Sequence, residues 1–282
     1  MTSASQMLGM ILGFAENDAR VRAVMLNGSR ANPNVTPDIF GDFDIVYLVS
    51  ELESFKRQPT WIDCFGERMI LQLPNDFGAN SPTDSYAYLI QLTDGNRIDL
   101  TLKTRAFTPD SLSVLLLDKD RNQPSLPAPS EQDYLPVPPT QKAYFEGCNE
   151  FWWVAPYVAK GLWRKEIIHA QQHLEILRRQ LLQMLEWQLG IQTGFCVPLG
   201  KSGKYYRQHM DKAAWGLLLE TYSSASVKNI WSALLAACRL FRTTALNVAR
   251  AFEFAYPMQD DSRVTAYLRH IRELPDNAQA IY

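Results

Sequence analysis

Two aspartates stand at the start of one apolar segment. Asp42 and Asp44 open the run GDFDIVYLVS at residues 41–50, whose β-branched and aromatic residues predict a core strand. Residues two apart on a strand share a face, so both carboxylates point the same way. Two carboxylates this close repel each other, and one takes up a proton unless a cation lies between them. Magnesium prefers oxygen ligands and leaves room for phosphate oxygens, so the pair predicts a Mg²⁺ site.

A third acid and a glycine–serine turn extend this pattern. Asp99 lies in NRIDLTL between apolar residues, again an acid on a strand that otherwise faces a core. Upstream, Gly28 and Ser29 in LNGSR let backbone N–H groups and a small hydroxyl approach a phosphate, because glycine has no Cβ in the way. Arg30 adds a positive charge beside them. The alternative, strand-end acids hydrogen-bonded to loop amides, accounts for one acid but poorly for three behind such a turn.

The first half of the chain supplies the elements that position these residues. Apolar residues at helical spacing predict a helix over residues 3–17 behind a serine cap. Asp94–Gly95 separates two strand-like runs, which is a strong hairpin signal. The predicted strands cover residues 21–29, 42–50, 67–74 and, as a hairpin, 85–104.

The second half of the chain is predicted to be helical. Seven prolines between residues 108 and 140 break any long element, so this stretch is predicted to be a connector. We place a domain boundary inside it, between residues 136 and 137. Beyond the boundary, apolar residues recur at intervals of three and four and predict one long helix over residues 160–190, ending at Gly190. Further helices are predicted over residues 226–254 and 262–274.

These motifs together resemble a known family. The spacing of the Gly-Ser turn, the Asp-x-Asp strand and the later aspartate is similar to that of the polymerase β-like nucleotidyltransferases. The segments NGSRANPNV, FGDFDIVYLV and NEFWWVAPYVAKGLWRKEI more narrowly resemble the aminoglycoside 6-adenylyltransferase (streptomycin adenylyltransferase) family. The resemblance implies an α+β fold, with a mixed-sheet nucleotidyltransferase domain at residues 1–136 and a helical bundle domain at residues 137–282.

The resemblance also implies an activity and roles for the acids. The expected reaction is Mg²⁺-dependent transfer of AMP from ATP to a hydroxyl of an aminoglycoside such as streptomycin, which releases pyrophosphate and inactivates the antibiotic. Asp42 and Asp44 would hold one or two Mg²⁺ ions, and Asp99 would be a metal ligand or the general base. Glu150 is a second candidate for the base. Gly28, Ser29 and Arg30 are expected to contact the nucleotide.

The helical half offers further candidates for binding. Lys160, Arg164 and Lys165 lie close together in the sequence and are expected, with Lys204, to contact the nucleotide phosphates, although such clusters are usually solvated faces. The residues expected to contact a cationic acceptor are Glu146, Glu150, Trp152 and Trp153, with the alternative that the tryptophans belong to the core.

Two sequence patterns in this half imitate other sites. His169 and His173 have the i, i+4 spacing of a helical zinc site, but the glutamate of HExxH and an obvious third ligand are missing. The segment GFCVPLGKSGK imitates a phosphate-binding P-loop, yet five residues separate Gly194 from Gly200 where four are required. We therefore assign neither a zinc site nor a P-loop.

Composition narrows the classes of partner and location. The chain has 282 residues, of which 46% are hydrophobic and 21% charged, the balance of an ordinary globular protein. The N-terminus lacks a basic region, and no apolar run approaches the roughly 20 residues that span a bilayer, so we expect a cytoplasmic protein without a membrane partner. A net charge of −2 without a basic, aromatic-interleaved stripe argues against nucleic acid. A monomer or weak dimer is expected.

The charges divide unevenly along the chain. Residues 1–140 hold 18 Asp and Glu against 11 Lys and Arg, whereas residues 141–282 hold 12 against 17. An acidic half joined to a basic half suits a site shared between metal ions and a phosphate ligand, and unrelated solvated faces are the alternative. Two other functions stay open: a nucleotidyltransferase with a different acceptor, such as a protein or another small molecule, and a catalytically idle nucleotide-binding protein. The crowded carboxylates argue against the idle protein.

Overall fold

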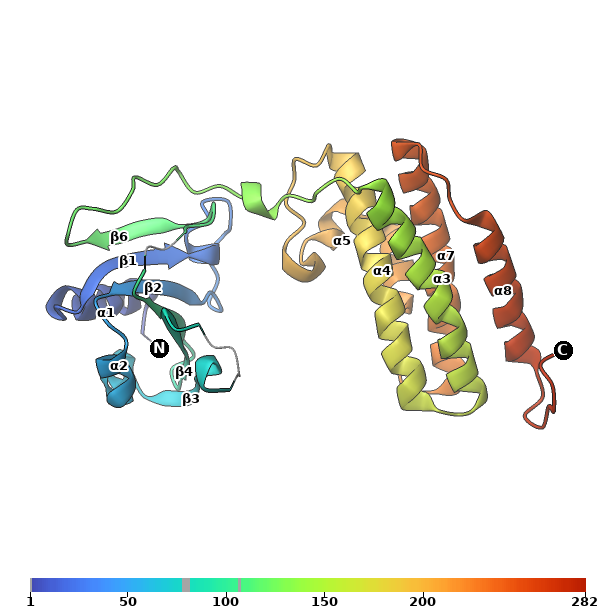
Figure 1. The fold of residues 1–282 in the computed structure, drawn as a ribbon, viewed down its shortest axis with the longest axis horizontal. Coiled ribbons are helices and arrows are strands. Elements are labelled where there is room, and N and C mark those ends of the chain that lie inside the picture. The colour runs from blue at the N-terminus through green and yellow to red at the C-terminus, as the bar shows by residue number, and fades with distance from the viewer. Residues whose placement is uncertain (1, 78–81, 106–107) are drawn as a thin grey trace. The chain divides into compact units, whose positions relative to one another are not determined.

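The computed structural model describes residues 2–77, 82–105 and 108–282 (Figure 1). The chain divides into two compact units, which we call unit 1 (residues 1–133) and unit 2 (residues 134–282). Unit 1 contains a mixed sheet with helices, and unit 2 is helical, which confirms the predicted α+β fold class. Among the described residues, no helix combines the length and the apolar character that a membrane crossing requires.

Unit 1 is built on a six-stranded sheet with the order β3-β4-β5-β2-β1-β6. All neighbouring strands pair antiparallel except β2 and β5, which run parallel. The strands are β1 (Val21–Asn27), β2 (Phe43–Val49), β3 (Arg68–Gln72), β4 (Ser85–Leu92), β5 (Arg97–Lys103) and β6 (Val114–Asp118). The predicted strands and the hairpin are therefore present. Alternate residues of β2 face two different cores, so the strand buries both of its faces.

One face of this sheet packs against α1 (Ala4–Asn17) and α2 (Glu53–Arg57). Ser3 and Gln6 form a capping box that starts α1, as the serine cap predicted. Ile11 of α1 is fully buried against the sheet, and its carbonyl accepts a hydrogen bond of 2.6 Å from Tyr47 Oη. Helix α1 is thus held to β2 by both apolar packing and a buried hydrogen bond.

Strand β6 lies inside the stretch that the sequence predicted to be a connector. Its five residues fall between Pro109 and Pro124, so no proline interrupts them, and they pair antiparallel with the free edge of β1. The prediction of a connector without structure is wrong at this point. The many prolines favoured a connector, but the five residues of β6 are enough for an edge strand.

Unit 2 packs its helices around one apolar core. Its helices are α3 (Gln141–Trp163), α4 (Ile167–Thr193), α5 (Tyr206–His209), α6 (Lys212–Glu220), α7 (Val227–Phe252) and α8 (Met258–Glu273). Helix α3 packs on α4 and α8, and α4 packs on α7, as Figure 1 shows. At the centre, the rings of Phe151 and Phe241 stack with centroids 3.7 Å apart.

The long helix predicted over residues 160–190 is two helices. Helix α3 ends at Trp163, because Lys165 adopts a left-handed φ of 62° and Glu166 donates its N–H to Gly161 O at 2.8 Å. The predicted stop at Gly190 is also wrong, since α4 continues to Thr193. A Cβ on Gly190 would lie 2.3 Å from the Phe195 ring, so this glycine serves close packing instead. Helices α5 and α6 were not predicted.

A buried ion pair joins the last two helices of unit 2. Asp261 of α8 is 2% exposed and accepts hydrogen bonds from Arg242 of α7, from Tyr256 Oη at 2.7 Å and from Thr265 Oγ1 at 3.0 Å. Burial pushes the pKa of Asp261 up, but these donors outweigh burial and leave it below its ordinary value. The carboxylate is therefore charged and fully partnered in the folded protein.

Candidate active site

The end of β1 and the starts of β2 and β5 meet at one end of the sheet in unit 1, which we call the sheet edge. Asp44 near the start of β2 lies opposite Asn27 at the end of β1 and opposite Asp99 near the start of β5. Side chains that are paired in register project from the same face of a sheet, so the two acids stand side by side. Asn27 Oδ1 is buried there and has no hydrogen-bond partner among the described residues. This edge collects acceptor oxygens in a way that packing alone does not require.

The Gly-Ser turn lies directly against the Asp44 carboxylate. Residues 28–30 form a short 3₁₀ turn after β1, and Gly28 has a left-handed φ of 70°. A Cβ built on Gly28 would lie 2.3 Å from Asp44 Oδ2, closer than any real contact. The Gly28 N–H is itself tied to Leu112 O at 3.1 Å, so the turn has no freedom to move away. Glycine is required here by both the backbone conformation and the neighbouring acid.

Gly28→Ala is therefore expected to impair both folding and turnover. A strained φ costs about 1–3 kcal/mol, and the added methyl group must displace the Asp44 carboxylate. The matched control is Gly9→Ala in α1, where nothing lies within 4 Å of the added Cβ. That control should gain roughly 0.5–1 kcal/mol and keep full activity. Urea denaturation and steady-state kinetics measure the two effects, and wild-type behaviour of Gly28→Ala in both would contradict this account.

Arg30 donates hydrogen bonds to the backbone that leads into β2. Its Nε donates to Asp42 O at 3.0 Å, its Nη2 donates to Gly41 O at 2.6 Å, and its guanidinium lies 3.9 Å above the Phe43 ring. These contacts fix the backbone on which Asp42 sits. Arg30 is thus already engaged as a positioning residue in this structure, and its predicted contact with the nucleotide stays a prediction.

Arg97 is a member of the site that sequence reasoning missed. Its Nε and Nη2 donate to the two oxygens of Asp99 at 2.8 and 2.9 Å, and its Nε lies 3.8 Å from Asp42 Oδ2. The available signal was its position two residues before Asp99 on the same strand, which places both on one face. The cation that the crowded carboxylates require is, in this structure, a guanidinium.

The pKa of Asp42 reflects its burial and the charges of its neighbours. Burial raises the pKa of its carboxyl, and the charge of Asp99 raises it further, while Arg97 and Arg30 act in the opposite direction. The net pKa is raised, so the two arginines do not fully compensate Asp42. An additional cation beside it would stabilise the ionised form.

The donor set partly fits a magnesium ion. Within the described ranges, no group of three or more His, Cys, Asp or Glu side chains is arranged to hold a metal ion. Asp99 is held by both oxygens on Arg97, so the predicted set of three ligands is not assembled. Magnesium is often bound through one or two carboxylates together with substrate phosphates, and Asp42 with Asp44 offers that chemistry.

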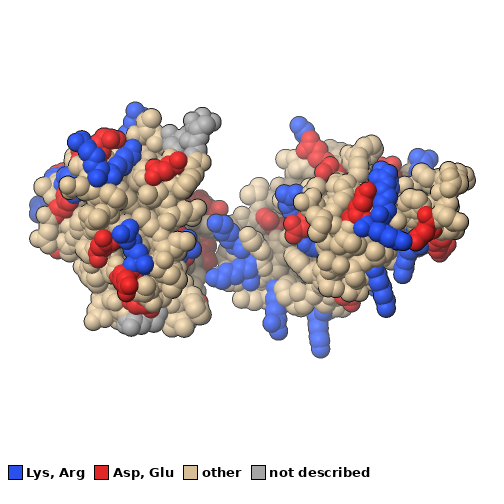
Figure 2. All heavy atoms as spheres, turned by 90° about the horizontal axis from the view of Figure 1, so that it is seen from below, with Lys and Arg blue, Asp and Glu red and all other residues tan. Residues whose placement is uncertain are grey.

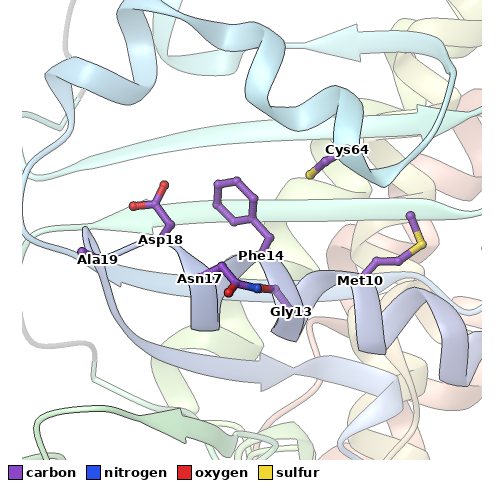
Figure 3. Close-up of a pocket in the computed structure, with 7 residues that line it drawn as sticks. All are labelled: Met10, Gly13, Phe14, Asn17, Asp18, Ala19 and Cys64. Atoms are coloured by element: carbon purple, nitrogen blue, oxygen red, sulfur yellow. The ribbon is translucent and has the colours of Figure 1, made fainter.

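Unit 1 also contains a cavity whose lining residues do not include these acids (Figure 3). It has a volume of about 600 Å³ and is lined by α1, the turn after it and Cys64. Its one acid, Asp18, is bound by Arg20. Burial raises the pKa of the Cys64 thiol to about 11, so the nucleophilic thiolate is scarce near neutral pH. This cavity contains none of the predicted site residues and no group equipped for the expected chemistry.

The acidic and aromatic candidates of the helical half lie on α3. Glu146 is exposed and lies 3.8 Å from Lys142, whereas Glu150 is partly buried. Trp152 is 2% exposed and packs edge-on against Phe241, so it belongs to the core. Trp153 is 64% exposed and remains accessible to a ligand.

The structure separates the four predicted phosphate-binding cations into two places. Lys160 and Arg164 line a cavity of about 180 Å³ with the C-terminal residues, and Lys165 already pairs with Asp276 at 2.5 Å. Lys204 belongs to the turn before α5, which Tyr206 ties to Leu182 O at 3.3 Å. Leu182 is 15 residues along α4 from its start at Ile167, which is about 22 Å of helix. The two groups therefore lie near different parts of α4, and their contact with the nucleotide phosphates stays a prediction.

The basic residues of unit 2 do not form one continuous surface in the view of Figure 2. Lys and Arg side chains are interspersed with Asp and Glu over the face that it presents. Residues 134–140 carry no charge, so the excess of 17 Lys and Arg over 12 Asp and Glu applies to unit 2 as well. The positive charge of this unit is therefore spread rather than focused on that face.

Comparison of the sequence with known proteins assigns the chain to a family. Residues 1–271 match the streptomycin adenylyltransferase family. An aminoglycoside 6-adenylyltransferase of Campylobacter jejuni is 40% identical over 93% of each chain, and one of Bacillus subtilis (strain 168) is 37% identical over 96% of this chain and 98% of its own. A crystal structure of an aminoglycoside 6-adenyltransferase from Bacillus subtilis has 32% identity and a TM-score of 0.48, and covers 97% of this chain and 100% of that one. The chain is an enzyme of the streptomycin adenylyltransferase family.

Proposed function

We propose that this enzyme transfers AMP from ATP to a hydroxyl of an aminoglycoside such as streptomycin, releasing pyrophosphate and inactivating the antibiotic. Family membership supports the reaction class, and the name that the relatives share favours the hydroxyl at position 6. The observation that carries the proposal is the close approach of the Gly28 turn to the Asp44 carboxylate, beside Asp99. A phosphate-binding turn and metal-binding acids have to lie this close for nucleotidyl transfer.

Each residue of the edge has a distinct part in this proposal. The turn receives the phosphates of ATP through the backbone N–H and the hydroxyl of Ser29, because the Gly28 N–H already donates to Leu112 O. Asp42 and Asp44 would hold magnesium, which would supply positive charge to neutralise the triphosphate. Arg30 keeps Asp42 in place through the backbone of the β2 entry. Burial is the main cause of the raised pKa of Asp42, and a cation beside it would favour its ionised form.

The general base is proposed to be Asp99 or Glu150. Asp99 stands next to Asp44, but Arg97 must release at least one of its oxygens before it can accept a proton or bind a metal. Glu150 is partly buried on α3, and no ion pair or hydrogen bond engages its carboxylate in the described part of the chain. Either carboxylate would take the proton from the attacking hydroxyl of the acceptor.

A single assay tests the proposed function. The protein is incubated with ATP, Mg²⁺ and a panel of aminoglycosides that includes streptomycin, while pyrophosphate release is followed and products are weighed by mass spectrometry. We expect pyrophosphate and an adenylylated aminoglycoside in equal amounts, and no product when EDTA removes the metal. Turnover of ATP with another class of acceptor only would instead favour the alternative nucleotidyltransferase. Nucleotide binding without any turnover would favour the idle binding protein.

A further inference from the structure

Unit 2 contains a polar cavity that the proposed active site does not use. It has a volume of about 230 Å³ and lies between the second half of α4 and the turn at residues 199–203. Glu186 and Gln183 of α4 line one side, and Tyr206 and Tyr134 contribute aromatic rings. The cavity is large enough for a substituted six-membered ring and is more polar than a packing defect would be.

Glu186 is the unexplained group in this cavity. Its carboxylate is half-buried, and burial alone raises its pKa, since no hydrogen-bond donor or cation offsets the loss of water. In the described residues, no ion pair or hydrogen bond engages this side chain. A partly buried carboxylate without a partner costs free energy, so folding alone gives no reason to keep it. Such groups are characteristic of sites where a ligand supplies the missing charge.

The neighbours of Glu186 do not supply that charge. Arg179 also lines the cavity, but its side chain is exposed and is not within ion-pair distance of Glu186. The Tyr206 hydroxyl, which lies near Glu186, donates to Leu182 O at 3.3 Å and is therefore committed elsewhere. Trp187, the next residue on α4, is buried in the helical core, so the helix is already anchored without Glu186.

The other walls of the cavity suit a flat or ring-borne cation. Tyr206 is 5% exposed and forms a buried part of the wall, while Tyr134 is 42% exposed and supplies the accessible aromatic ring. Aromatic faces attract ammonium and guanidinium groups, and a carboxylate beside them adds a charge-assisted hydrogen bond. The turn that closes the cavity holds Ser202 at a left-handed φ of 58°, a strained conformation that shapes binding loops more often than plain connections.

We propose that this cavity binds a ring bearing ammonium or guanidinium groups on the acceptor, with Glu186 as its counter-ion. The inference rests on the proposed function for the identity of the acceptor, and it adds a specificity-determining residue outside the sheet edge. Gln183 presents an amide to hydroxyl groups of the same ring. Glu186 thereby selects cationic acceptors over neutral sugars of the same size.

Glu186→Gln tests the proposal, since it removes the charge and keeps the shape. We expect the KM for streptomycin to rise about 10- to 100-fold, the loss of one charge-assisted contact, with kcat at saturation and the KM for ATP changed less than about twofold. The variant should melt at or above the wild-type temperature, because an uncompensated buried charge has gone. Glu220→Gln, an exposed glutamate of the same unit, is the matched control and should behave as wild type.

Binding separates this inference from the proposed function. Calorimetry with streptomycin and a nonhydrolysable ATP analogue measures affinity without turnover. Turnover by the wild type with an unchanged KM and affinity in Glu186→Gln would overturn the inference and leave the function standing. Binding that weakens in Glu186→Gln, in a protein that does not adenylylate any aminoglycoside, would support the cation site while the function fails. A lower melting temperature with unchanged affinity would show that Glu186 is structural, and absence of aminoglycoside binding by the wild type would overturn both.

Discussion

Asp44→Asn should abolish turnover while leaving unit 1 folded. The substitution keeps the volume of the side chain but removes the charge that we propose to bind the metal, next to the Gly28 turn and Asp99. Charge stabilisation by a bound metal is worth several kcal/mol, so kcat should fall by at least about 10²-fold. Without metal, the melting temperature should be equal to or above that of the wild type, because a repulsive charge has been removed. Steady-state kinetics and thermal denaturation measure the two effects.

The control for this variant comes from the loop that leads into β2. Asp38 accepts the Phe40 N–H at 2.8 Å, and an asparagine accepts the same bond, so Asp38→Asn should retain both activity and stability. If Asp44→Asn kept more than about a tenth of the wild-type kcat, its loss would be under roughly 1.4 kcal/mol. The assignment of Asp44 as a metal ligand would then be wrong.

Asp261→Ala should be the most destabilising of the substitutions considered. Removing a buried carboxylate leaves Arg242, Tyr256 and Thr265 without their shared acceptor. Breaking a buried pair on one side costs about 3–5 kcal/mol, and the lower end applies because Arg242 is 34% exposed and can reach water. Urea denaturation followed by circular dichroism measures the loss. Asp260→Ala, which removes the exposed neighbour in the same helical turn, should change stability by less than about 1 kcal/mol.

The pH dependence of stability checks the same ion pair. The folded-state pKa of Asp261 lies below its unfolded value, so its contribution is fully present above the unfolded pKa of about 3.9. That contribution is lost as the pH falls through the folded pKa. The difference in stability between wild type and Asp261→Ala should therefore be constant near neutral pH and shrink below about pH 4. A difference that stays constant into strong acid would show that the carboxylate acts through packing alone.

Local features of the sequence predicted the sheet edge well. The alternation of strand residues placed Asp42 and Asp44 opposite to Phe43 and Ile45, and both of those apolar side chains are buried. Asp94–Gly95 predicted the hairpin because a short turn is decided by its own backbone preferences, and residues 93–95 form that turn between Leu92 and Asn96. Each of these predictions depends on residues within a few positions of one another.

Features that depend on contacts between residues far apart in the chain could not be predicted from the sequence. The approach of Arg97 to Asp42, unlike its local pairing with Asp99, depends on the parallel register of β2 and β5, which no local pattern encodes. The separation of Lys204 from Lys160 depends on the break at Lys165 and on the turn that returns to Leu182. The burial of Glu186 likewise depends on residues 199–203 folding back over α4. The sequence shows which residues are charged and in what order they occur, but their spacing did not predict which of them lie together in one site.

The parallel pairing of β2 with β5 has a consequence for how the enzyme is made. Asp44 and Asp99 are neighbours in space but 55 residues apart in the chain, and β3 and β4 have to be synthesised between them. Hairpins close quickly, whereas a pairing across such a loop requires a larger loss of chain entropy and forms late. A nascent chain that ends before residue 97 therefore carries the Gly-Ser turn, Asp42 and Asp44 while the side of β2 that pairs with β5 is still unpaired. Until β5 is synthesised, the side of β2 next to Asp44 lacks its partner strand and is open to incorrect pairing.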